Sequence, residues 1–155
     1  SDVNKLLNDT LQLLEPQLRK SNIEIIKDYE TELPEITGNA GKLQQVFTNL
    51  ILNARDAMFG GGSITLRTFA ADENTVVVEV VDSGEGIPDE NLSKIFDPFF
   101  TTKGVGNGTG LGLAVTYGIV QEHAGSIEAT SDGRNGSTFR ITFPAASAIR
   151  RRAVS

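Results

Sequence analysis

The chain has 155 residues, a net charge of -6 and no cysteine, with 39 % apolar and 22 % charged residues. This is enough for one globular domain with a buried core. The negative charge argues against binding to duplex nucleic acid, the lack of cysteine excludes disulfides and thiolate chemistry, and no apolar run is long enough to span a bilayer.

The first half of the chain predicts two helices around one strand. Leucine and valine residues recur at helical spacing over residues 3–20, and Pro16 interrupts them, which predicts a kink or an end to the first part of that helix. A strand is expected over 22–29, with Ile23 and Ile25 on one face. Residues 41–58 give the clearest helical pattern, which the three glycines at 60–62 end.

The second half predicts strands over 63–69 and 75–82, and the second of these is apolar on nearly both faces, as a central strand would be. Residues 83–110 predict a long irregular stretch of functional importance. A helix over 111–123 and a hairpin of strands 126–131 and 137–143 follow. This order predicts an α+β fold of two layers, with helices on one face of a mixed sheet. The domain is expected to cover residues 1–146, followed by a disordered basic tail over 147–155.

A polar stripe runs along the predicted helix 41–58. Its members share one face by spacing and are Lys42, Gln45, Asn49, Asn53 and Asp56. Two asparagines in mid-helix lower helix propensity, and an asparagine side chain offers a hard oxygen ligand for magnesium. An ordinary solvent-exposed face is an equally good interpretation of the stripe alone.

Asp82 directly follows the central strand and is succeeded by Gly84 and Gly86. A carboxylate at the end of a buried strand is a fixed hydrogen-bond acceptor, to which adenine could offer its exocyclic amine. Glycines next to it allow a flat ligand to approach the backbone. A β-turn with an aspartate cap is the alternative interpretation.

Five alternating glycines at 104–112 lead into the apolar helix that starts near residue 111. Backbone amides without side chains at a helix N-terminus form an anion site, which predicts phosphate binding. A flexible linker is the less favoured alternative, because linkers do not usually lead into so apolar a helix. The segment is neither a Walker A loop nor a strict dinucleotide fingerprint.

Taken in order, these motifs resemble the boxes of bacterial sensor histidine kinases. Asn49 and Asn53 resemble the N box, residues 82–86 the G1 box, residues 95–103 the F box, residues 108–113 the G2 box, and residues 136–139 the last block. The ordered set spans residues 2 to 144 and is far more specific than any one box. The Phe-Phe-Thr-Thr-Lys form of the F box resembles that of nitrogen-regulation and oxygen-sensing kinases.

The resemblance implies the Bergerat fold of the GHKL superfamily, with a mostly antiparallel sheet, a mobile lid over about 96–110, and ATP and Mg²⁺ as ligands. By this likeness Asn53 holds magnesium, Asp82 reads the adenine amine, and Ser137 or Thr138 assists through a water molecule. Lys103 and Arg55 are candidate phosphate contacts, for which a solvated surface charge is an equal alternative. The implied nucleotide-binding set is Asn49, Asn53, Asp56, Asp82, Gly84, Gly86, Ile87, Phe96, Lys103, Gly108, Thr109, Gly110, Leu111, Gly112, Leu113, Ser137 and Thr138. Three phenylalanines of the F box are expected mainly to anchor the lid, namely Phe96, Phe99 and Phe100.

The hydrolysing members of the superfamily resemble one another in carrying a glutamate four residues before the magnesium asparagine. Here that position is Asn49, and a neutral amide is a poor general base. His123, the single histidine, lacks the sequence context of a phospho-acceptor and is expected to be a structural residue at a helix end. The acceptor is therefore expected on separate dimerisation helices of the same polypeptide.

The resemblance further implies a downstream response regulator as partner, a parent that dimerises through the missing helices, and a cytoplasmic location. The fragment itself is expected to be a monomer, and its charge and hydropathy predict no nucleic-acid partner and no membrane insertion. The alternatives are a serine kinase of the same fold, or a nucleotide-binding module without transfer activity.

Overall fold

The computed structural model describes residues 1–97, 112–131 and 135–147. Its elements, in chain order, are α1 (Val3–Lys20), β1 (Ile23–Tyr29), α2 (Ala40–Asp56), β2 (Gly62–Asp72), β3 (Thr75–Asp82), α3 (Asp89–Leu92), α4 (Gly112–Glu122), β4 (Ser126–Ser131) and β5 (Ser137–Pro144). Each helix and strand predicted from the sequence is present, with ends that shift by a few residues. The predicted tail falls outside the described residues beyond 147, so its disorder stays a prediction.

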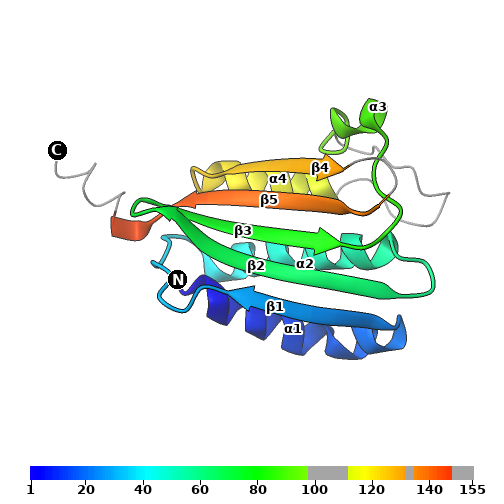
Figure 1. The fold of residues 1–155 in the computed structure, drawn as a ribbon. Coiled ribbons are helices and arrows are strands. Elements are labelled where there is room, and N and C mark those ends of the chain that lie inside the picture. Colours follow the sequence, from blue (N-terminus) through cyan, green and yellow to red (C-terminus); the bar gives the residue numbers. More distant parts are fainter. Residues whose placement is uncertain (98–111, 132–134, 148–155) are drawn as a thin grey trace.

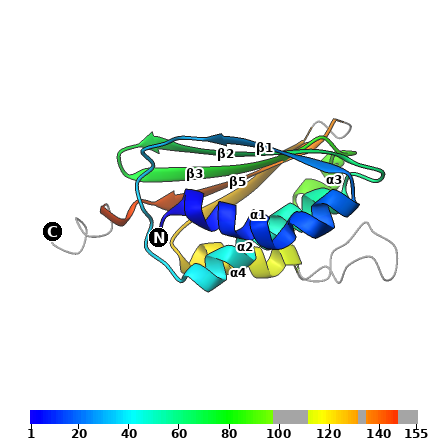
Figure 2. The same cartoon turned by 90° about the horizontal axis from the view of Figure 1, so that it is seen from below.

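The five strands form one sheet in the order β1-β2-β3-β5-β4 (Figure 1). β1 is parallel to β2, and the other neighbouring strands are antiparallel. α1, α2 and α4 lie side by side on one face of the sheet, with α2 in the middle (Figure 2). The two-layer, mostly antiparallel fold is therefore confirmed, as is the central position of β3.

The core lies between this sheet and the three helices. Side chains at alternate positions of β5 point into it, and Phe139, Ile141 and Phe143 are buried, because successive residues of a strand face opposite sides. α2 contributes the fully buried Phe47 and Leu50. The other face of the sheet has no helix over it in the described part of the chain (Figure 2).

Charged side chains cross that open face. Glu79 of β3 accepts hydrogen bonds from Arg67 of β2 at 3.0 Å and from Arg140 of β5 at 2.9 Å. Hydrogen bonds to Asp28 and Glu79 raise the pKa of the Arg67 guanidinium. The buried Glu79 carboxylate is thus paired on both sides, as a charge in so enclosed a position must be.

α1 is continuous through Pro16, so the predicted end of the helix at this residue is wrong. Pro16 removes the hydrogen bond to the carbonyl group of Gln12, but both residues are exposed, so water can replace the missing donor. The helix begins at a cap, where the Asp2 carboxylate accepts a hydrogen bond from the Lys5 amide at 3.2 Å.

The prediction of an irregular stretch over 83–110 is wrong at Asp89–Leu92, which form the one-turn helix α3. The sequence carries a signal for this helix, because Pro88 precedes it and Asp89 and Glu90 occupy its first turn. The predicted lid over 96–110 and most of the G2 box lie outside the described residues, which stop at 97 and resume at 112.

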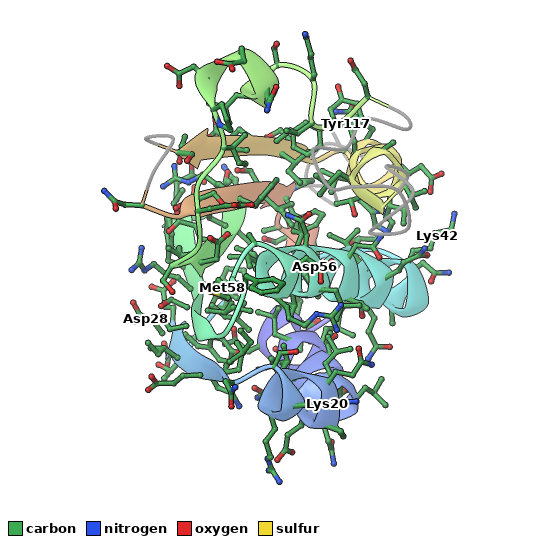
Figure 3. The ribbon with its side chains drawn as sticks, turned by 90° about the vertical axis from the view of Figure 1, so that its right-hand side faces the viewer. Lys20, Asp28, Lys42, Asp56, Met58 and Tyr117 are labelled. Carbon is green, nitrogen blue, oxygen red and sulfur yellow. The ribbon has the colours of Figure 1, made fainter. Side chains whose placement is uncertain are left out.

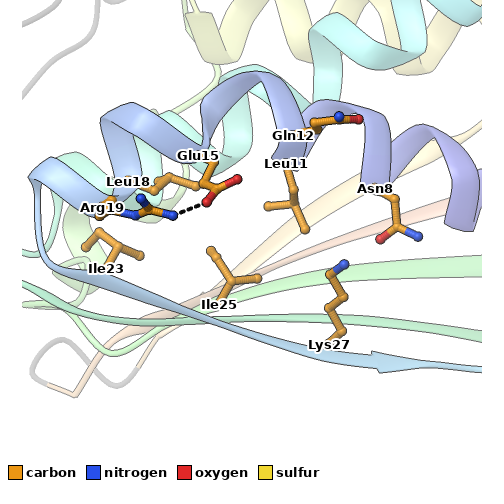
Figure 4. Close-up of a pocket in the computed structure, with 9 residues that line it drawn as sticks. All are labelled: Asn8, Leu11, Gln12, Glu15, Leu18, Arg19, Ile23, Ile25 and Lys27. Carbon is orange, nitrogen blue, oxygen red and sulfur yellow. Dashed lines mark hydrogen bonds and ion pairs between the residues drawn. The ribbon is translucent and has the colours of Figure 1, made fainter.

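A groove of about 460 Å³ lies between α1 and β1 (Figure 4). Its lining residues belong to these two elements and are Asn8, Leu11, Gln12, Glu15, Leu18, Arg19, Ile23, Ile25 and Lys27. It belongs to the β1 edge of the sheet and contains none of the residues predicted to bind nucleotide. No helix of the described chain is long and apolar enough to cross a membrane.

Candidate nucleotide-binding site

Asp82 ends the central strand β3 with its carboxylate buried, at 4 % exposure. One oxygen, Oδ2, accepts a hydrogen bond from the Ser137 hydroxyl at 2.6 Å, and Oδ1 accepts one from the Gly84 amide at 2.9 Å. Two carboxylate oxygens can together accept about four hydrogen bonds, so this group retains acceptor capacity. Asp82 is therefore a fixed, oriented acceptor at the end of the sheet.

The register of β3 and β5 separates Ser137 from Thr138. Ser137 lies directly opposite Asp82, and Thr138 lies opposite Val81. Since neighbouring residues of a strand face opposite sides, the Ser137 side chain is on the helix-covered face with Asp82, and Thr138 is on the open face. The structure thus places Ser137 beside Asp82 and Thr138 on the opposite face of the sheet, and a role of either residue in nucleotide binding stays a prediction.

Gly84 lies against the backbone just after α2, whereas the sequence led us to expect a flat ligand beside it. A Cβ atom at this position would lie 2.4 Å from the carbonyl oxygen of Ala57, just past the end of α2, and the Glu85 amide donates to the same oxygen at 3.3 Å. The missing side chain therefore makes room for α2 rather than only for a flat ligand. Gly86 has a φ of +81°, a left-handed conformation that favours glycine.

The far side of this loop is held by the hairpin of β4 and β5. Ser131 accepts a hydrogen bond from the Ile87 amide at 2.8 Å and donates one to the Gly136 carbonyl group at 2.8 Å. Gly136 is left-handed, with a φ of +87°, and a Cβ atom there would lie 2.1 Å from the Asp82 carbonyl oxygen. Ser131 is absent from the predicted set, because a serine at the end of a strand does not show in sequence which backbone groups it will meet.

The polar stripe of α2 faces α4. Asn49 donates from Nδ2 to the Gly112 carbonyl group and to the Thr116 hydroxyl, both at 3.2 Å. Lys42, near the start of α2, pairs with Glu122 at 2.9 Å, and this hydrogen bond and charge lower the pKa of Glu122. The interpretation of the stripe as an ordinary solvent-exposed face is therefore wrong for Asn49, whereas Lys42 is exposed and its pair with Glu122 lies on the surface.

Asn53 lies one helical turn beyond Asn49 and is half-buried. Its side chain makes no hydrogen bond to any residue that the structure describes, so its amide oxygen is available to a ligand. The described residues also contain no cluster of three histidine or acidic side chains that could hold a metal ion. One hard oxygen suits magnesium bound together with a polyphosphate, because that ion takes its remaining ligands from water and phosphate oxygens.

Arg55 and Asp56 are the last two residues of the same helix, where Figure 3 labels Asp56. Arg55 donates from Nη1 to Gln17 of α1 at 3.1 Å and from Nη2 to Asp56 at 2.9 Å. The guanidinium group thus ties α2 to α1, on the side of α2 away from α4. Its contact with phosphate stays a prediction, as does that of Lys103, which is outside the described residues.

Phe96 packs between α4 and β5. Its ring centroid lies 5.7 Å from that of Tyr117, which Figure 3 shows on α4, and 6.2 Å from that of Phe139 in an edge-to-face arrangement. This is the packing expected of an anchor at the start of the predicted lid. Gly112 and Leu113 open α4, and the remaining predicted residues fall in the undescribed segment, namely Phe99, Phe100, Gly108, Thr109, Gly110 and Leu111.

His123 directly follows α4, and both of its ring nitrogens are engaged. Nδ1 lies 2.8 Å from the Ile119 carbonyl oxygen, and Nε2 accepts a hydrogen bond from the Asn39 amide at 3.2 Å. Gly38 packs so closely that a Cβ atom there would lie 2.3 Å from the imidazole. Through these two contacts the ring joins the end of α4 to the start of α2.

Comparison with known proteins agrees with this geometry. Residues 38–147 match the family of histidine kinase-, DNA gyrase B- and HSP90-like ATPases. Among solved structures, the catalytic domain of histidine kinase ThkA is 34 % identical, with a TM-score of 0.81 over 93 % of this chain and 95 % of that one. The fold and the family match together define an ATP-binding domain. The chain belongs to the family of histidine kinase-, DNA gyrase B- and HSP90-like ATPases, and within it to the catalytic domains of histidine kinases.

Longer relatives are similar over nearly the whole chain. Sensor kinase CckA of Brucella abortus is 44 % identical over 92 % of this chain, and sporulation kinase A of Bacillus subtilis is 42 % identical over the same share. The chain spans only 16 % and 23 % of those two proteins. The full-length structure of ShkA, in complex with AMPPNP, is 28 % identical, with a TM-score of 0.84 over 94 % of this chain and 30 % of its own length.

Proposed function

We propose that this domain binds Mg-ATP in the site around Asp82 and donates the γ-phosphoryl group to a histidine on dimerisation helices of its parent kinase. The observation that carries the proposal is the buried Asp82 carboxylate, oriented by Ser137 and Gly84 at the end of the central strand. Asn53 lies on the neighbouring helix with its amide free of partners among the described residues. The AMPPNP complex of ShkA supports the choice of nucleotide.

In this proposal Asp82 recognises the adenine base. The two hydrogen bonds it accepts fix the plane of the carboxylate, and the remaining lone pairs accept the exocyclic amine of adenine. Guanine and hypoxanthine present a carbonyl group at the equivalent position, and two acceptors facing each other repel. The site therefore selects adenine by one hydrogen bond that it is built to make.

Asn53 would hold the magnesium ion through its amide oxygen. The ion supplies charge neutralisation for the β- and γ-phosphates when it is bound. The N-terminus of α4, which begins at Gly112, would add backbone amides for the phosphates. Transfer then depends on position and charge rather than on covalent participation by the domain.

The geometry around Asn49 supports transfer over hydrolysis. Its amide nitrogen is committed to Gly112 and Thr116 of α4, and a neutral amide cannot take a proton from water. The nucleophile must then come from another segment. His123 is held by hydrogen bonds at both nitrogens, so we infer that it is not the acceptor.

The partners follow from the same proposal. The phospho-accepting helices belong to the parent polypeptide, and the phosphoryl group passes on to a response regulator. ThkA, 32 % identical over 94 % of this chain, has been solved in complex with the response regulator TrrA. The domain would work in the cytoplasm, where ATP is supplied, and the isolated fragment would be a monomer.

Calorimetry with a non-hydrolysable ATP analogue tests the site. Asp82→Asn keeps the shape of the side chain but loses its charge, and we expect affinity to fall at least about tenfold, the loss typical of a hydrogen bond to a charged group. Asn53→Ala is expected to abolish only the gain in affinity on adding magnesium. Asp9→Asn on α1, far from the site, is the matched control and should bind like wild type.

A folded wild-type domain that does not bind the analogue would overturn the proposal. Transfer is tested separately by supplying the dimerisation fragment of the parent kinase with Mg-ATP. We expect phosphohistidine on that fragment and none on this chain. Stoichiometric phosphorylation at His123 would contradict the assignment of the acceptor to another segment.

A further inference from the structure

Ser131, the last residue of β4, connects two segments that are distant in sequence. Its hydroxyl accepts a hydrogen bond from the Ile87 amide and donates one to the Gly136 carbonyl group, each at 2.8 Å. Ile87 belongs to the loop that follows Asp82, and Gly136 immediately precedes β5. One side chain thus sets the distance between the two segments that border the proposed adenine site.

Each of these two segments also contacts Asp82 directly. On one side, the Gly84 amide donates to the carboxylate at 2.9 Å. On the other side, the Ser137 hydroxyl donates to it at 2.6 Å, and Gly136 packs against the Asp82 carbonyl group. Short pieces of backbone and hydrogen bonds therefore form a closed ring through Asp82, Gly84, Ile87, Ser131, Gly136 and Ser137.

We propose that Ser131 is a positioning residue for nucleotide binding, which holds residues 84–88 at a fixed distance from the Asp82–Ser137 pair and so sets the width of the adenine site. It acts through Ile87 and Gly136. The proposal rests on the proposed function, because it requires adenine to bind at Asp82.

The chemistry of the position requires a hydroxyl group. Only a group that donates and accepts at the same time can join an N–H and a C=O group in this way. Alanine would leave both backbone groups without this partner, whereas threonine keeps the hydroxyl. Loss of two neutral hydrogen bonds predicts about five- to tenfold weaker binding.

The experiment compares Ser131→Ala, Ser131→Thr and Ser126→Ala by calorimetry with ADP and IDP. Ser126 is the matched control, because it is the exposed serine at the other end of the same strand. We expect Ser131→Ala to bind ADP about five- to tenfold more weakly and IDP with little change, so that the preference for adenine shrinks. Ser131→Thr and Ser126→Ala should match wild type, and the magnesium dependence should be the same in all four proteins.

Hydrogen exchange at the Ile87 amide, measured by NMR without nucleotide, is the second readout. We expect faster exchange in Ser131→Ala than in wild type or Ser126→Ala. The inference is overturned if Ser131→Ala binds ADP within about twofold of wild type. It is also overturned if ADP and IDP weaken equally, because that result indicates a general loss of structure.

The two proposals fail in different ways. If the folded wild-type domain does not bind ADP, the proposed function fails and this inference fails with it. If wild type binds ADP with a clear preference over IDP, and Ser131→Ala keeps that preference, only the role of Ser131 is wrong.

Discussion

The two ends of the sheet hold polar groups in contrasting ways. The site end, where β3 finishes and β5 begins, holds the Asp82 carboxylate with acceptor capacity to spare. At the far end, where β1 finishes, Asn4 donates to the Glu30 carbonyl group at 2.9 Å and accepts from the Thr68 hydroxyl at 2.8 Å. Thr68 in turn accepts from the Glu30 amide at 3.2 Å. At the far end, the side chains of Asn4 and Thr68 and the backbone of Glu30 thus form hydrogen bonds with one another.

This difference distinguishes polar groups that contribute to stability from polar groups that can contribute to ligand binding. A network in which donors and acceptors are matched contributes only to folding. A buried carboxylate that accepts fewer hydrogen bonds than it can is stabilised less, but it can still bind a ligand. The site end tolerates this because Gly84 and Gly136 let the backbone approach Asp82 closely and hold it in place.

The largest effect is expected from Gly136→Ala at the site end. The new Cβ atom would lie 2.1 Å from the Asp82 carbonyl oxygen, and the residue would keep a φ of +87°. Forced backbone movement together with left-handed strain predicts a loss of about 3 kcal/mol in the free energy of unfolding. Urea denaturation measures the loss, and ATP binding should fall with it.

Gly60→Ala is the control for that collision. Gly60 has nearly the same φ, +89°, but nothing lies within 4 Å of an added Cβ atom. Only the conformational cost of about 1 kcal/mol is expected there. Equal losses for the two variants would show that Asp82 does not crowd Gly136.

A smaller effect is expected from Asn4→Ala at the far end. The change leaves the buried Thr68 hydroxyl without its acceptor and the Glu30 carbonyl group without its donor, which predicts a loss of about 2 kcal/mol. Nucleotide affinity should not change, because the network lies at the opposite end of the sheet. Asn8→Ala, exposed on the same helix, is the control, and weaker ATP binding by Asn4→Ala would refute the separation of the two ends.

The smallest effect belongs to Tyr29, whose hydroxyl is buried without a hydrogen-bond partner among the described residues. Burial raises the pKa of Tyr29 from 10.0 to about 12. Because folding favours the neutral phenol, its contribution to stability is complete below pH 10 and is lost as the pH rises towards about 12.

Tyr29→Phe should therefore be neutral or slightly stabilising at pH 7 and should remove about 1 kcal/mol of the alkaline destabilisation. Denaturation curves of both proteins across this range measure the difference. Tyr117→Phe, at an exposed tyrosine on α4, is the control. Parallel pH profiles for wild type and Tyr29→Phe would argue against the burial of this hydroxyl.

Much of the site could be predicted from local patterns. Helical spacing gathers Asn49 and Asn53 on one face of α2, and the apolar run of β3 places Asp82 at the end of a central strand. These features are periodic or adjacent in sequence, so they do not depend on how distant segments pack. Local patterns could not predict which of Ser137 and Thr138 lies beside Asp82, because that depends on the register between two strands.

The sequence by itself determined the order of helices and strands, the α2 stripe and the histidine kinase resemblance, since these depend on spacing along one chain. Only the tertiary structure decided that the stripe faces α4, that Gly84 makes room for the end of α2, and that Ser131 joins two distant backbone segments. Most of those contacts join residues that are dozens of positions apart. They arise from strand register and helix packing, which position side chains through the whole core rather than through neighbours in the chain.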